Sequence, residues 1–228
     1  MTMLHDVAEN GSLLLADYGG VSMSHELYIL DTDCKPTYAH IFDMEFCSSS
    51  GEKLSYLEFK KGIPLASLSP VIKFWKSNKK KMPDFLHNMY LLPVVSKAFR
   101  DILAQLNVNS IEYFPISVEY KGVLIDHSHM LMNILGGQHC IIDWRKSSFQ
   151  PSYHKCAAAF KLTHVELLED AIPKSDIFWE AECRELVVTQ KVADALLSAK
   201  ISGIKLIAIP EYRGRFHLND NIKKKIGE

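Results

Sequence analysis

Three histidines and one cysteine near the middle of the chain are the residues best suited by type to bind a metal ion. His127 and His129 are two positions apart, and side chains so spaced in a strand point to the same face. His139, Cys140 or Asp143 could supply a third ligand, and three protein ligands with one water describe a catalytic zinc site. His127 and His129 are therefore the metal candidates of a hydrolase or a metal-binding regulator. An exposed turn that carries both histidines is the alternative.

The patterns that usually mark an active site are absent from the sequence. The chain has no H-E-x-x-H, paired C-x-x-C, G-x-S-x-G, P-loop or G-x-G-x-x-G motif. Glu180, Glu182 and Glu185 form an acidic cluster, for which we expect a solvated face rather than an acid–base pair. We therefore expect a protein that is not an enzyme, with no catalytic residues and no cofactor.

The composition is that of an ordinary globular protein. The chain has 228 residues, of which 47% are apolar and 23% charged, and its formal net charge is −1. This balance produces no global field that would attract nucleic acid or an anionic membrane. Five cysteines lie scattered without a C-x-x-C pair, which favours reduced thiols. The chain has no apolar stretch of about 20 residues and no basic, apolar start, so we expect a cytoplasmic protein.

One stretch of the chain occurs twice. Residues 94–103 and 187–196 align without a gap, at a constant offset of 93 positions. Ser96 and Thr189 occupy the place of a helix N-cap. Apolar residues then follow at helical spacing, and they are Phe99, Ile102, Leu103 and Leu106 in the first copy and Val192, Ala195, Leu196 and Ala199 in the second. A β-prone run comes next, so each copy predicts a strand, a capped helix and a strand. Two unrelated units that each bury one face would also look alike.

These elements predict an α+β fold. We expect a mixed β-sheet built from two related strand–helix–strand units, around 91–118 and 184–210, with additional β-hairpins. Gly136-Gly137 marks one expected hairpin, and residues 54–59 are predicted as a strand that ends in a turn. We divide the chain into a loosely ordered leader (1–20), a β-rich N-terminal half (21–119), a C-terminal half (120–212) and a fraying tail (213–228). The two halves could also form one continuous domain.

A set of short motifs is spread over most of the chain. The motifs are Pro83-Asp84-Phe85, Val94-Val95-Ser96, Ile111-Glu112-Tyr113-Phe114-Pro115-Ile116, Met132-Asn133-Ile134-Leu135, Asp143-Trp144-Arg145-Lys146-Ser147-Ser148-Phe149, Ile177-Phe178, Leu186-Val187-Val188-Thr189 and Ile201-Ser202-Gly203-Ile204. This set resembles the eleventh numbered family of bacterial immunity proteins, formerly a domain of unknown function. The resemblance implies a cytoplasmic antidote of a polymorphic toxin system, encoded beside the toxin gene. Such a protein binds the cognate toxin domain and protects the producer and its kin in interbacterial competition. A general protein-interaction module is the blander alternative.

A toxin-binding protein needs a few anchor residues at its interface, and such anchors are enriched in Trp, Tyr and Arg. The candidates by type and by position in or beside expected loops are Trp144, Arg145, Tyr153, Tyr212, Arg213 and Arg215. Packing in the core is the competing role for Trp144 and for Phe216.

The segment 143–149 has a structural interpretation of its own. Asp143 can accept backbone N–H groups two or three residues further on and so fix a turn. Ser147 or Ser148 could add a second bond, and Phe149 could pin the turn to the core. We favour this role, with direct contact to the toxin as the alternative.

Overall fold

A computed structural model gives the fold and describes residues 26–68, 70–77, 81–121, 123–126, 128–154, 157–216 and 220–226. The expected leader, residues 1–20, lies outside these ranges. In chain order the elements are β1 (Leu27–Thr32), β2 (His40–Cys47), η1 (Tyr56–Lys60), η2 (Ala66–Leu68), β3 (Val71–Ser77), β4 (Phe85–Asn88), β5 (Val94–Val95), α1 (Lys97–Gln105), β6 (Ile111–Tyr120), β7 (Val123–Asp126), β8 (Met130–Ile134), β9 (Gln138–His139), β10 (Ser148–His154), β11 (Ala157–His164), η3 (Glu169–Ala171), β12 (Ile177–Glu180), β13 (Leu186–Thr189), α2 (Gln190–Ser198), β14 (Ile204–Ala208), η4 (Ile209–Glu211), β15 (Arg215–Phe216) and α3 (Asp220–Ile226), where η denotes a 3₁₀-helix.

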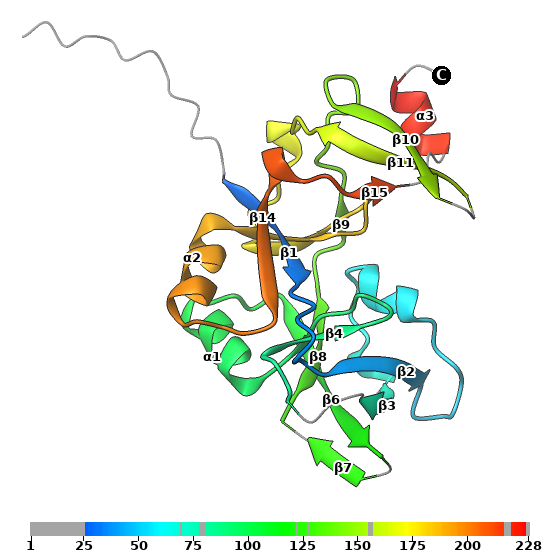
Figure 1. Ribbon diagram of the computed structural model, residues 1–228, viewed down its shortest axis with the longest axis vertical. Helices are drawn as coiled ribbons and strands as arrows, with labels where there is room; N and C mark the ends of the chain where they lie inside the picture. Colours follow the sequence, from blue (N-terminus) through cyan, green and yellow to red (C-terminus); the bar gives the residue numbers. More distant parts are fainter. Residues whose placement is uncertain are drawn as a thin grey trace, which may run out of the picture.

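The described elements form an α+β fold that is mostly sheet, as predicted (Figure 1). Five strands make one sheet in the order β14-β1-β13-β12-β9, and seven make a second sheet in the order β3-β2-β4-β5-β8-β6-β7. Strands β10, β11 and β15 make a small third sheet, which lies with α3 at one end of the molecule. Helices α1 and α2 contact each other and lie side by side at the edge of the view.

The two predicted units correspond position by position. The first consists of the β4–β5 hairpin, α1 and β6, and the second of the β12–β13 hairpin, α2 and β14. The helices begin at Lys97 and Gln190, which are again 93 positions apart. Asn107 and Lys200 end them with left-handed backbones, at φ 59° and 54°, and the following N–H bonds back to a helix carbonyl in both units. The prediction of two related strand–helix–strand units is confirmed.

A strand from outside each unit completes its sheet. In the first unit β8 runs antiparallel between β5 and β6, and in the second unit β1 runs antiparallel between β13 and β14. The orders β4-β5-β8-β6 and β12-β13-β1-β14 are therefore equivalent. In both units the two strands that flank the helix are parallel but not adjacent. Because β1 comes first among the described strands, the second unit completes its sheet only when β1 pairs with strands far along the chain.

Asp84 links the two units. Its Oδ1 accepts a hydrogen bond from the hydroxyl of Ser96, the N-cap residue of α1, at 2.7 Å. Its Oδ2 accepts bonds from the hydroxyl and the N–H of Ser202, in the loop after α2, at 2.6 and 3.0 Å. Gly203 follows with φ +83°, and a Cβ there would lie 2.3 Å from the carbonyl oxygen of Phe85. Glycine therefore lets this loop approach β4 closely.

Asp176 holds the equivalent place in the second unit. Thr189 occupies the N-cap position of α2, but its hydroxyl donates to Asp176 Oδ1 at 2.9 Å instead of capping a helix N–H. Lys191 donates to Asp176 Oδ2 at 2.7 Å and to the carbonyl of Leu106, after α1, at 3.2 Å. Each unit thus has an aspartate that connects the start of its own helix with the loop after the other helix, directly in one case and through a lysine in the other.

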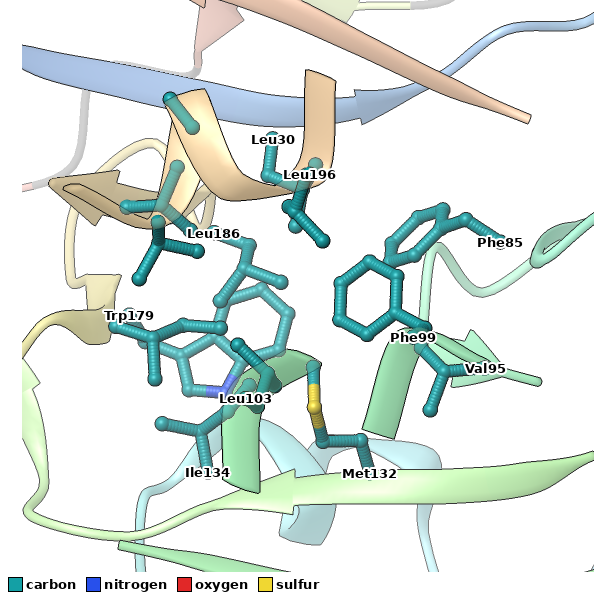
Figure 2. Packing of buried hydrophobic residues seen from close by; sticks show 14 residues of the cluster. Leu30, Phe85, Val95, Phe99, Leu103, Met132, Ile134, Trp179, Leu186 and Leu196 are labelled. Carbon is teal, nitrogen blue, oxygen red and sulfur yellow. The ribbon is translucent and has the colours of Figure 1, made fainter. Parts of the chain in front are cut away.

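One hydrophobic core lies where the two units meet. Figure 2 shows Phe85, Val95 and Met132 of the seven-stranded sheet facing Trp179 and Leu186 of the five-stranded sheet. The helices contribute the residues of the predicted stripes, of which Phe99, Leu103, Val192 and Leu196 are fully buried, Ile102 and Leu106 are partly buried, and Ala199 is exposed. The two units are therefore held together by one shared core.

Gly136-Gly137 does not form the predicted hairpin. These residues connect β8 to β9, which belong to different sheets, and β9 pairs with β12 in parallel. Both glycine N–H groups donate to the carbonyl of Gly62, each at 3.0 Å. A Cβ on Gly62 would lie 2.4 Å from the backbone of Gly137, so glycine serves a close crossing of two segments here. The hairpins of this region are β6–β7 and β10–β11.

Two other predictions of local structure are wrong. Residues 54–59 form no strand, because Ser55 caps the 3₁₀-helix η1 by accepting a bond from the N–H of Leu57 at 3.2 Å. The tail does not simply fray, because residues 220–226 form α3. Ile222 of α3 is fully buried in a core with Trp144 and Phe216. A long-range apolar contact, which a sequence pattern does not reveal, holds this helix.

Leu103 and Leu196 are the equivalent leucines of α1 and α2, and both are 0% exposed. Replacing either by Ala should lower the free energy of unfolding by about 2–5 kcal/mol, because the lost side chain leaves a cavity. Leu197→Ala is the matched control, since Leu197 is 58% exposed, and should cost less than about 0.5 kcal/mol. Urea unfolding measures all three values. If a buried variant lost no more than the control, the helix stripe would not face the core.

Asp84→Ala should lower the free energy of unfolding by about 1–3 kcal/mol, because Ser96 and Ser202 lose their acceptor. Burial opposes ionisation of Asp84, but the hydrogen bonds from Ser202 and Ser96 outweigh it and hold the pKa below its ordinary value. Such a carboxylate stabilises the fold above its unfolded-state pKa of about 4 and loses this effect as the pH falls through the folded-state value. The difference between wild type and variant should therefore shrink in acid.

The control for Asp84→Ala is Asp101→Ala, which removes an exposed ion pair with Lys97 on α1. It should cost less than about 1 kcal/mol, because surface pairs of this kind are screened by solvent. Denaturant unfolding at several pH values measures both variants. Equal losses in the two would contradict a special role for Asp84.

Candidate functional site

The described part of the structure does not group the predicted metal ligands into one site. His129 is buried, and its Nε2 lies 2.8 Å from the carbonyl oxygen of Pro83. The ring of His139 packs edge-on against Phe178, with centroids 5.5 Å apart, while Cys140 is exposed. His127 lies outside the described residues. Within the described ranges, the one group of His, Cys and carboxylate side chains close enough to hold a metal contains none of the predicted ligands.

The segment 143–149 forms the turn that the sequence predicts. Asp143 Oδ1 accepts a hydrogen bond from the N–H of Arg145 at 3.1 Å, and its carbonyl accepts one from the N–H of Ser147 at 2.8 Å. The hydroxyl of Ser147 accepts from the N–H of Glu166 at 3.0 Å, so the turn is also tied to the chain after β11. Phe149 packs against the hydrophobic core of this region. The structural interpretation of the segment is confirmed.

Two of the predicted anchors lie in the interior. Trp144 is 3% exposed and Tyr212 6% exposed, and both belong to the core that includes α3. The ring of Trp144 packs against that of Phe216, with centroids 4.7 Å apart. The alternative role weighed for Trp144 and Phe216, packing in the core, therefore describes both rings.

The other candidates lie on the surface or beside it. Arg145 is exposed, and its Nε donates to the carbonyl of Lys225 at the end of α3, at 3.2 Å. Arg213 is exposed and donates to the carbonyls of Pro210 and Tyr212 at 2.7 and 2.9 Å. Tyr153 belongs to β10 and Arg215 to β15, and their side chains lie outside the described part of the structure.

The acidic cluster is buried in the turn of the β12–β13 hairpin. Glu180 is 2% exposed, and its Oε2 accepts the backbone N–H groups of Glu182 and Cys183 at 2.9 and 2.6 Å. The side chain of Glu182 is 5% exposed and accepts hydrogen bonds from Trp144 Nε1 and from Lys225 Nζ. The prediction of a solvated face is wrong, because the turn bonds to α3 and to the segments that lead into the third sheet. The glutamates join that layer to the second unit.

Burial changes the protonation of this cluster. Desolvation raises the pKa of Glu180 to about 8, although its two backbone hydrogen bonds favour the carboxylate. Burial also raises the pKa of Glu185 and that of Tyr212, whose hydroxyl donates to Glu185 Oε1 at 2.6 Å. Glu180 is therefore largely a neutral acid at pH 7, and folding is coupled to its protonation.

Glu185 and Tyr212 form the wall of an open cleft of ≈ 500 Å³. The cleft is lined by Asp31, Glu185, Lys205, Leu206, Ile207, Glu211, Tyr212, Arg213 and Gly214. Both acidic and basic side chains line it, which suits a partner surface that carries both charges. Sequence reasoning found Tyr212 and Arg213 but missed Asp31 and Lys205. These two residues come together because they are register partners in the β1–β14 pair, which no local pattern announces.

A second hollow, of ≈ 390 Å³, adjoins the same stretch of chain. It is lined largely by apolar side chains, among them Leu27, Val165, Leu167, Ile172 and Ile209. Residues 208–210 line this hollow and residues 211–214 line the cleft, so the end of β14 and η4 separate the two. A charged cleft and an apolar hollow on one stretch provide the two kinds of contact that protein interfaces combine.

Residues 30–211 match the sequence model of the Imm11 immunity protein family. The chain belongs to this family. The resemblance is thereby confirmed, and membership suggests a toxin-neutralising immunity role. No curated protein matches the chain. The matched range runs from β1 to η4, so it contains both units of this Imm11 protein and most of the cleft.

Two of the motifs that carry the resemblance meet in space. The N–H of Asp84 donates to the hydroxyl of Ser202 at 3.0 Å, and the N–H of Phe85 donates to the Ser202 carbonyl at 3.0 Å. Pro83-Asp84-Phe85 and Ile201-Ser202-Gly203-Ile204 therefore contact each other within the fold and join its two units.

Of the helices among the described residues, none is long and apolar enough to span a bilayer.

The raised pKa of Glu180 predicts how the stability of the Imm11 protein depends on pH. The folded state holds this proton more tightly than the unfolded chain, so stability should fall as the pH rises from about 4.5 to about 8. Glu180→Gln should flatten this slope, leaving the smaller part due to Glu185. Glu52→Gln, at an exposed position, should leave the slope unchanged. Denaturant unfolding from pH 4.5 to 8.5 measures it, and a slope identical in Glu180→Gln and wild type would refute the assignment.

Proposed function

We propose that this Imm11 protein neutralises a bacterial toxin domain by binding it tightly, without turning over a substrate. The observation that carries the proposal is the family match over residues 30–211. The partner would be a cognate toxin domain encoded nearby, and neither nucleic acid nor a membrane would take part. The protein would act in the cytoplasm of the producing cell, where reduced thiols persist, and the described cysteines, Cys34, Cys47, Cys140 and Cys183, are free.

The buried acids of the protein support binding over catalysis. A general acid or base has to reach a substrate proton at hydrogen-bond distance. Glu182 instead accepts hydrogen bonds from Trp144 and Lys225, and Glu185 accepts one from Tyr212. The side chains of Glu182 and Glu185 are largely buried because they connect the hairpin turn to these partners. A role in shaping a contact surface suits them better than proton transfer.

The cleft and the neighbouring apolar hollow are the proposed contact surface. Arg213 and Lys205, of which the latter belongs to β14, are exposed residues that line the cleft. Tyr212 supports the surface from beneath instead of inserting into the toxin. Arg145, Tyr153 and Arg215 remain predicted contacts. A toxin segment with both an acidic and an apolar side chain would fill the two depressions together.

Neutralisation by binding demands high affinity, because a few free toxin molecules suffice to harm the cell. A Kd of about 1 nM corresponds to about −12 kcal/mol of binding free energy. An interface of roughly 1,600 Å² supplies this when a few anchors fill pockets. The cleft and the hollow are open depressions of the size that toxin side chains could fill.

Co-expression with the adjacent toxin domain should restore growth of a sensitive host, and the two proteins should co-elute in gel filtration as a stable complex. The physical reason is that little toxin stays free when this protein is in excess over the toxin and its own concentration greatly exceeds a nanomolar Kd. Continued killing without co-elution, while this protein is folded and abundant, would refute the proposal.

Arg213→Ala combined with Lys205→Glu should weaken toxin binding by at least about tenfold, or roughly 1.4 kcal/mol, because the cleft loses its basic side chains. Lys97→Glu is the matched control, since Lys97 is an exposed lysine on α1 remote in the chain from the cleft. Calorimetric titration with the toxin domain measures the affinities. Unchanged affinity in the cleft variant, with native thermal stability, would place the contact surface elsewhere.

A further inference from the structure

A cysteine and two histidines from three segments converge beside β2. Cys34 lies in the loop after β1, His40 begins β2, and His87 belongs to β4. Their ligand atoms all lie within 4.8 Å of one another. His40 and His87 are register partners in the parallel β2–β4 pair, and their ring centroids are 5.1 Å apart. Strand pairing therefore fixes the positions of two of the three groups.

The separation of the donor atoms suits a tetrahedral metal site. Cys34 Sγ lies 3.4 Å from His87 Nδ1. Zinc bonds of about 2.3 Å to sulfur and about 2.0–2.1 Å to nitrogen place two tetrahedral ligands about 3.6 Å apart. A rotation of the exposed Cys34 side chain would bring its Sγ closer to the ring nitrogen of His40, from which it is at most 4.8 Å away.

The surroundings provide support for such a site. The N–H of Asp33 donates to the carbonyl of Gly203 at 2.9 Å, which holds the loop that carries Cys34. The hydroxyl of Thr32 lies 2.8 Å from His87 Nδ1 and 3.6 Å from Cys34 Sγ. When a metal takes the ring nitrogen, this hydroxyl is free to donate to the thiolate, as outer-shell groups of metal ligands commonly do.

We propose that Cys34, His40 and His87 bind one divalent ion of the zinc class, with water in the fourth position. One thiolate and two imidazoles are ligands that this borderline-soft class prefers. Strand β1 belongs to the five-stranded sheet, and β2 and β4 belong to the seven-stranded sheet. The ion would connect the loop after β1 with β2 and β4. It would therefore act as a clip between the two units and stabilise the folded chain.

The test uses the full chain with its purification tag removed and with bound metal stripped by a chelator. Titration with Co²⁺ should produce a sulfur-to-metal charge-transfer band that saturates at one ion per chain. Zn²⁺ should displace the cobalt and raise the melting temperature. Cys34→Ser, in an exposed loop, should abolish the band and weaken zinc binding at least tenfold, and His87→Ala should do the same.

Cys140→Ser and His164→Ala are the matched controls, because both residues are exposed and lie outside the cluster. Both should keep the band and the affinity of the wild type. The proposal is overturned if the wild type shows no charge-transfer band, if Cys34→Ser keeps it, or if Cys140→Ser loses it. Cys34→Ser decides the question even if His87→Ala fails to fold.

Discussion

The carboxylate of Asp84 is the interaction on which the arrangement of the two units depends. One side chain satisfies the N-cap serine of α1 and, at the same time, the serine of the loop that follows α2. Each helix has only nine residues, a length at which an isolated helix is marginal in water. Their stability therefore comes from the Ser96 cap of α1, from the bonds of Asp176 at the start of α2 and from the core that the two units share. Because Gly203 has no side chain, the loop and β4 can come close enough for these bonds.

This constraint extends to the surface where we place the function. Fixing the loop after α2 also fixes the start of β14, and β14 positions β1 as its antiparallel neighbour. The β1–β14 pair contributes Asp31 and Lys205 to the cleft, and the loop after β1 contributes Cys34 to the proposed metal site. The glutamates of the β12–β13 turn tie this framework to α3 and to the segments that lead into the third sheet. A surface built on paired strands is preorganised, and preorganisation reduces the entropy lost on binding.

The sequence predicts the parts of this fold that local periodicity decides. The helices follow from the apolar stripes after Ser96 and Thr189, and the turn at Asp143 follows from the bonds that an aspartate can make to nearby N–H groups. Failures arise where distant segments decide the outcome. Gly136-Gly137 has the composition of a hairpin turn but packs on Gly62, and Ile222 holds the tail helix through contacts with a remote core.

The candidate functional residues also depend on contacts between distant segments, which local sequence does not predict. Glu180, Glu182 and Glu185 look like a solvated acidic face, because three glutamates within six residues normally avoid burial. Only the tertiary structure shows the tryptophan, tyrosine and lysine that donate hydrogen bonds to Glu182 and Glu185. Trp144 and Tyr212 are found as anchors by residue type, but their exposure depends on layers that form far away in the chain. The strands that bring Asp31 to Lys205, and Cys34 to His87, are separated in sequence, so neither group has a local signature.

Our central proposal is that this Imm11 protein inhibits a toxin by binding it in a one-to-one complex. The most direct measurement is the residual activity of a fixed amount of purified toxin domain as the protein is added in steps. Stoichiometric binding predicts a linear fall that reaches zero at a ratio of one to one, with active toxin recovered when the complex is dissociated. Complete and lasting inactivation by a small fraction of one equivalent would show turnover and would contradict the account.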